Sequence, residues 1–177
     1  MNGPNWHSLD QAIRNIIPIC LTFLLLVLSV IPTGIPYYSE ITPVLPIIAI
    51  YHWAIYKPDL LPTWSVFILG CVYDLLSGTP LGLYALVFLS VYGIVIFQRR
   101  FLYGKSFLVC WLGFGVVALG AAIESWVVAS IWYFSLLNAT SVFFQYFLSL
   151  GMFPIVAWVA LQLQQHLLEQ DENAPRS

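Results

Sequence analysis

Charged residues are scarce in this sequence. Asp, Glu, Lys and Arg make up 8% of the 177 residues, whereas apolar residues make up 60%. A soluble domain has about 25% charged residues, so this chain lacks the polar surface that a globule needs in water. The composition therefore predicts a membrane protein. The sequence also lacks a basic patch, which argues against nucleic acid as a partner.

Residue patterns that carry out catalysis or bind metals are missing as well. Cys20, Cys71 and Cys110 lie in apolar segments without the short spacing of metal ligands, and the three histidines are scattered. The sequence contains no Gly-x-Ser-x-Gly, no His-Glu-x-x-His and no phosphate-binding loop. We therefore expect a protein that is not an enzyme and that holds no metal and no cofactor.

Six apolar segments are candidates for membrane-spanning helices, each of which needs about 20 mostly apolar residues. They cover residues 16–35, 41–56, 60–76, 81–97, 107–134 and 141–162. The second and third are short and contain prolines, so a re-entrant pair that does not cross is the alternative for them. We predict an all-α polytopic membrane protein with six transmembrane helices, in which residues 1–177 form a single integral membrane domain.

The positions of the basic residues favour six crossings. If the N-terminus is cytoplasmic, every basic residue faces the cytoplasm: Arg14, Lys57, Arg99, Arg100, Lys105 and Arg176. This arrangement agrees with the positive-inside rule, whereas a re-entrant pair would place Lys57 outside. We therefore expect a lipid-embedded, multi-pass protein with a short cytoplasmic N-terminus (1–15) and a cytoplasmic tail (163–177).

Gly70, Asp74 and Gly78 recur every four residues inside the third apolar segment. On one helix they would share a face, with small groups around a single carboxylate. Small residues let another helix approach closely, so we expect replacement of Gly70 or Gly78 by Leu to weaken a helix contact. Gly82 follows Pro80 and is expected on the next turn of chain.

Asp74 and Glu124 are acidic residues within apolar segments. An ionisable residue inside a membrane is costly unless it has a partner or a wet cavity. For each of them a functional site, a contact with a partner helix and a structural role are open. If Asp74 bonds to local backbone near Ser77 and Gly78, Asp74→Asn should be nearly silent and Asp74→Leu harmful.

Residues 46–86 resemble the rod shape-determining MreD family of bacteria. The pattern is a segment with a tryptophan, then a proline, then Gly-x-x-x-Asp-Leu-x-x-Gly-x-x-Leu-Gly. The residues that carry it are Trp53, Pro58, Phe67, Gly70, Asp74, Leu75, Gly78, Leu81, Gly82, Ala85 and Leu86. Cys71 replaces the usual leucine after the first glycine. The remainder of the chain agrees in length, in topology and in having an acid, Glu124, in the fifth segment.

The resemblance implies a scaffold of the cell-elongation machinery in the bacterial inner membrane. Such a scaffold would bind the single-span protein MreC, would work with MreB, RodA and a penicillin-binding transpeptidase, and would help control peptidoglycan synthesis and rod cell shape. The family is similar in fold to the six-helix substrate-binding subunits of energy-coupling-factor transporters. The alternative function is therefore a substrate-binding subunit for a vitamin-type solute, with an outer pocket near Asp74 and Glu124.

Overall fold

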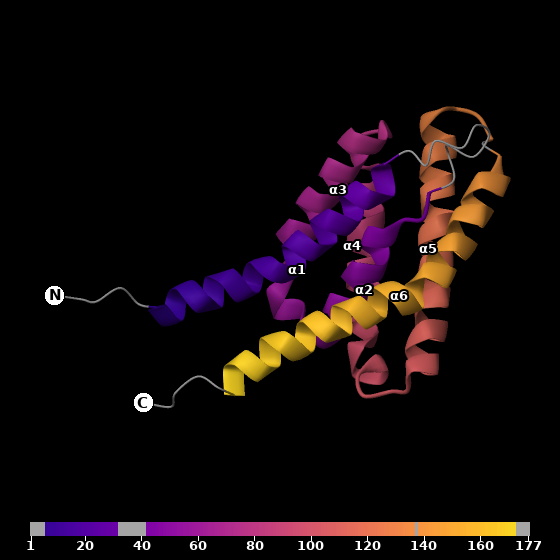
Figure 1. Cartoon of the computed structure of the whole chain (residues 1–177). Coiled ribbons are helices and arrows are strands. Elements are labelled where there is room, and N and C mark those ends of the chain that lie inside the picture. The colour runs from indigo at the N-terminus through magenta and orange to yellow at the C-terminus, as the bar shows by residue number, and fades with distance from the viewer. Residues whose placement is uncertain (1–5, 32–41, 137, 173–177) are drawn as a thin grey trace.

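The computed structural model describes residues 6–31, 42–136 and 138–172, and its regular elements there are all helical (Figure 1). A short 3-10 turn, η1 (Pro58–Leu60), joins the second and third of six α-helices. The helices are α1 (Trp6–Val30), α2 (Leu45–Tyr56), α3 (Thr63–Ser77), α4 (Leu83–Leu102), α5 (Phe107–Trp132) and α6 (Ala139–Glu172).

Each helix overlaps one of the six predicted apolar segments, which confirms the all-helical fold class. The boundaries differ most at the chain ends, because α1 begins at Trp6 and α6 continues to Glu172. Among the described residues, three stretches are long and apolar enough to cross a membrane, namely Leu83–Leu102, Phe107–Trp132 and Ala139–Gln162. The apolar part of α1 (Ile17–Val30), α2 and α3 are shorter. Length and composition thus support three of the six predicted crossings directly.

Helix α2 forms the centre of the molecule. Every residue from Leu45 to Ile55 is buried, including Trp53, which is completely shielded from solvent. Helices α1, α4 and α6 pack around α2. This agrees with its sequence, because a helix without a polar face is expected in a core. Its 12 residues span only about 18 Å, less than the roughly 30 Å of a bilayer's hydrocarbon core.

The N-terminus of α2 lies inside the bundle and depends on other helices for its hydrogen bonds. The backbone N–H of Val44 donates to Ser149 Oγ of α6 at 3.1 Å, and that of Leu45 donates to Ser29 Oγ of α1 at 3.0 Å. Ser149 lies about 15 Å from the first residue of α6, measured along the helix axis, and so well inside that helix. Since apolar surroundings offer no water to unpaired N–H groups, these two hydroxyls complete a helix start that has no local side-chain cap.

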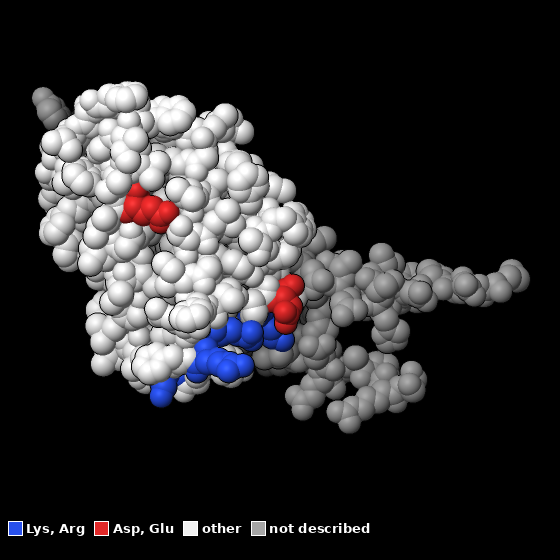
Figure 2. Space-filling view, turned by 180° about the vertical axis from the view of Figure 1, so that it is seen from behind, with Lys and Arg blue, Asp and Glu red and all other residues white. Residues whose placement is uncertain are grey.

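The other end of α2 meets the basic end of the molecule. Arg99 of α4 donates from Nε to the carbonyl of Ile55 at 3.0 Å, a favourable position for a cation because the C-terminal end of a helix carries partial negative charge. Lys57 follows α2 directly, Arg100 follows Arg99, and Lys105 lies in the turn before α5. Figure 2 shows the visible basic side chains together at one end of the molecule.

Candidate functional site

Asp74 lies in the last turn of α3 and is completely buried. Its carboxylate accepts four hydrogen bonds. Oδ1 accepts from Thr79 Oγ1 at 2.8 Å and from the Tyr84 N–H at 2.9 Å. Oδ2 accepts from the N–H groups of Gly82 at 2.9 Å and Ala85 at 3.4 Å. Three of the four donors are thus backbone groups, and all three belong to the first turn of α4.

The Asp74 carboxylate therefore caps a helix to which it does not belong. Gly82 is the N-cap residue of α4 and has no side chain with which to cap it. The first N–H groups of a helix have no intrahelical acceptor, and the positive end of the helix dipole favours an anion there. Hydrogen bonds to charged groups contribute about 1.5–3 kcal/mol each, which offsets the cost of burying the carboxylate.

Gly82 also sets the backbone of this cap. Its φ is +100°, a backbone conformation that residues other than glycine rarely adopt. A Cβ added at Gly82 would meet nothing within 4 Å. The conformation, rather than lack of space, requires glycine at this position. Leu81 precedes it at the tip of the turn and is 66% exposed.

Gly78 has a different role from the one that its spacing suggested. Helix α3 ends at Ser77, and Gly78 follows as its C-cap with φ +70°. Its N–H and that of Thr79 both donate to the main-chain carbonyl of Asp74, as is common where a left-handed residue ends a helix. No atom lies within 4 Å of a Cβ added at Gly78. The predicted small face of α3 therefore does not extend to Gly78.

Gly70 is the point of closest approach between α3 and α4. A Cβ added there would lie 2.3 Å from Ala85 Cα and 2.7 Å from Ala85 N. These are backbone atoms of the turn that Asp74 caps, so they cannot move aside without moving the start of α4. The close packing expected of this motif is thus present, and it lies within the chain.

Glu124 lies on α5, away from the Asp74 cap. It is partly buried, and its Oε1 accepts a hydrogen bond from Ser90 Oγ of α4 at 2.8 Å. The structure therefore brings Gly70, Asp74 and Gly82 together in the α3–α4 junction, with Gly78 and Leu81 in the connecting turn. It places Glu124 separately in the α4–α5 contact.

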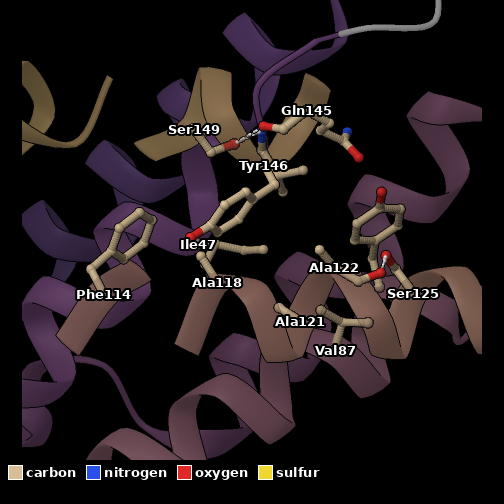
Figure 3. A pocket seen from close by; sticks show the side chains of 12 residues that line it. Ile47, Val87, Phe114, Ala118, Ala121, Ala122, Ser125, Gln145, Tyr146 and Ser149 are labelled. Carbon is tan, nitrogen blue, oxygen red and sulfur yellow. Dashed lines mark hydrogen bonds between the residues drawn. The ribbon is translucent and has the colours of Figure 1, made fainter. Parts of the chain in front are cut away.

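The cavity at the junction of α2, α4, α5 and α6 is small. Its lining includes Ile47, Phe114, Ser125, Gln145 and Tyr146 (Figure 3), and its volume of about 20 Å³ is room for a single water molecule. Larger spaces of about 220 Å³ and 240 Å³ adjoin α5 and α6 elsewhere. Neither Asp74 nor Glu124 lines any of these three cavities.

Sequence reasoning missed the residues that cap α2. Ser29 and Ser149 are small polar residues in apolar segments, and Gln145 donates from Nε2 to the Thr42 carbonyl at 2.9 Å. Isolated polar residues in apolar helices were the available signal, but their partners lie up to 105 positions away in the chain. No spacing pattern identifies such pairs.

The family model of the rod shape-determining protein MreD matches residues 10–168 of this chain. The match covers most of the molecule, including the α3–α4 junction and Glu124, whereas the resemblance in the sequence was carried by about forty residues. No curated protein and no solved structure gives a significant match.

Gly70→Ala should destabilise the protein by about 1–3 kcal/mol, because even a methyl group overlaps the backbone of Ala85. Gly151→Ala is the matched control, since it lies in α6 with nothing within 4 Å of an added Cβ. The measurement is the apparent melting temperature of the purified protein in mild detergent. Equal melting temperatures for the two variants would contradict the close approach of α3 and α4.

Asp74→Asn should destabilise the protein by about 1–3 kcal/mol, and Asp74→Leu should be worse. Both carboxylate oxygens accept from backbone N–H groups, which can only donate, so the NH₂ of Asn would face a donor whichever way it turns. This geometry revises the expectation that Asn would be nearly silent. Asp59→Asn is the control, since Asp59 is exposed in η1. Melting of the Asn variant at the wild-type temperature would refute the capping role.

Proposed function

Because the chain belongs to the MreD family of rod shape-determining membrane proteins, we propose that it is a scaffold of the cell-elongation machinery. It binds MreC and helps control peptidoglycan synthesis, in company with MreB, RodA and a penicillin-binding transpeptidase. The family match over residues 10–168 is the observation that carries this proposal. MreD is not known as a family of enzymes.

The form of the molecule supports a scaffold role. The connections that the structure describes between α3, α4 and α5 are short turns, and the outward faces of α4, α5 and α6 are covered with exposed apolar side chains. The Asp74 carboxylate is fully occupied with holding α4 to α3. Partner proteins would therefore meet this chain mainly through its helix faces within the membrane.

We propose further that the chain is a single domain with six crossings in the bacterial inner membrane, with residues 1–15 and 163–177 cytoplasmic. Lys57 at the end of α2, Arg99 and Arg100 in the last turn of α4, and Lys105 before α5 support this orientation, and Arg99 bonds to the end of α2. Helices α1 and α6 also extend past the others on the same side of the bundle (Figure 1). The short helices α2 and α3 would cross as buried or tilted parts of the bundle rather than as independent spans.

No observation favours the alternative of a solute-binding subunit. A vitamin-sized ligand needs a site of roughly 300–1,000 Å³, whereas the three cavities described above have volumes of about 20, 220 and 240 Å³. Among the described residues, Asp74 is completely buried and lines none of these three cavities. The fold likeness to energy-coupling-factor subunits stays a prediction.

Cysteine labelling tests the proposed orientation. In a variant in which Cys20, Cys71 and Cys110 are replaced, we expect Lys57→Cys and Lys105→Cys to react with an impermeant maleimide only after the membrane is opened. Ser135→Cys, in the exposed segment after α5, should react in intact spheroplasts and serves as the control. Labelling of position 57 from outside would favour the re-entrant pair over six crossings.

Copurification tests the scaffold function. Solubilisation of native membranes in mild detergent should recover MreC with this chain, and depletion of the chain should turn rod-shaped cells round. Recovery of an ATPase module and a small solute in place of MreC would instead support a transporter subunit.

A further inference from the structure

Glu124 is a carboxylate that the fold leaves incompletely covered. It lies about 12 Å from the outer end of α5 and therefore below the polar headgroups. Among the described residues, the Ser90 hydroxyl is the donor bonded to it, although a carboxylate has about four lone-pair sites. Asp74, by comparison, is fully buried with four hydrogen bonds. Figure 2 shows an acidic area within an otherwise uncharged face, apart from the basic end.

Two open glycines lie beside Glu124. Helices α4 and α5 run antiparallel, with Ser90 bonded to Glu124 and Leu102 beside Gly113. This register places Gly93 of α4 and Gly120 of α5 at one level, next to the carboxylate on its inner side. Both glycines are exposed, and an added Cβ at either would meet nothing within 4 Å.

The fold itself does not require glycine at these two positions. Neither has the positive φ of Gly78 or Gly82, and neither approaches a neighbour as Gly70 does. Glycine within a helix costs roughly 0.5–1 kcal/mol relative to alanine. Together with Glu124 they make up a surface of small residues around a carboxylate, which we call the α4–α5 notch. Leu86, Ile94 and Val116 are exposed on the same two helices.

We propose that this α4–α5 notch is the docking site for a membrane-spanning helix of a partner protein, which supplies a hydrogen-bond donor to Glu124. Small residues let the partner helix come close, and its donor covers a carboxylate that is costly to leave facing lipid. The donor is a hydroxyl, an amide or a basic side chain at the depth of Glu124. This inference rests on the proposed function as a scaffold and adds the surface that the scaffold uses.

The charge of the notch argues against other occupants. In a two-fold interface with a second copy, the same patch faces itself, so each Glu124 would lie near the Glu124 of its copy. The chain has no Lys or Arg between residues 106 and 175 with which to pair it, and the basic residues of α4 are in its last turn. A lipid acyl chain has no donor to offer.

The test uses Gly120→Leu and Glu124→Leu in the full-length protein, with MreC as the single-span partner. Gly151→Leu is the control, because Gly151 is equally exposed and open but lies on α6. We expect at least a tenfold loss of MreC copurification for the two notch variants and none for the control. Gly120→Leu and Gly151→Leu should melt in detergent near the wild-type temperature, since an added Cβ at either position meets nothing within 4 Å. Glu124→Leu loses the hydrogen bond from Ser90 and should melt lower, so Gly120→Leu is the variant that separates docking from stability.

A second measurement locates the contact. A photoreactive residue at position 120 should cross-link to the spanning segment of MreC, whereas one at position 151 should not. Normal copurification by both notch variants, with no cross-link from position 120, would overturn the notch and leave the scaffold function intact. Failure of the wild-type chain to recover MreC would overturn both proposals.

Discussion

The structure depends on finding acceptors for N–H groups at helix starts that lie away from water. An unpaired N–H in hydrocarbon costs several kcal/mol, and neither α2 nor α4 has a local side chain that caps it. In both cases another helix supplies the acceptor. Asp74 of α3 holds the start of α4, and Ser29 and Ser149 hold the start of α2. Hydrogen bonds are directional, whereas apolar contacts are not. These caps therefore determine which neighbour lies beside the start of each helix.

The two membrane-embedded acids illustrate two uses of a carboxylate. Asp74 is buried, and both of its carboxylate oxygens accept hydrogen bonds from the start of α4, so the carboxylate joins α3 to α4. Glu124 is only partly buried and bonded to Ser90, so it retains capacity for a further donor. Both are carboxylates in apolar segments, and it is their surroundings in the fold that distinguish them.

The positions of all six helices could be predicted from the sequence, because runs of apolar residues are sufficient to place them. The geometry around Asp74 could not. A four-residue spacing implies one continuous helix face, but α3 ends at Ser77 and Gly78 turns the chain with a positive φ. The spacing predicts close packing at Gly70, but the neighbour that comes so near, Ala85, is evident only from the path of the turn between α3 and α4. The caps of α2 escaped prediction because they join distant parts of the chain.

The hydrogen bond from Val44 to Ser149 has a consequence for how the protein is made. Ser149 belongs to α6, which leaves the ribosome after α2 because it lies later in the chain. Until α6 has entered the membrane, the N–H of Val44 lacks its acceptor, although that of Leu45 can already bond to Ser29 of α1. Insertion of α6 therefore completes the hydrogen bonding at the start of the central helix, and a chain interrupted before α6 would have that helix start incompletely bonded.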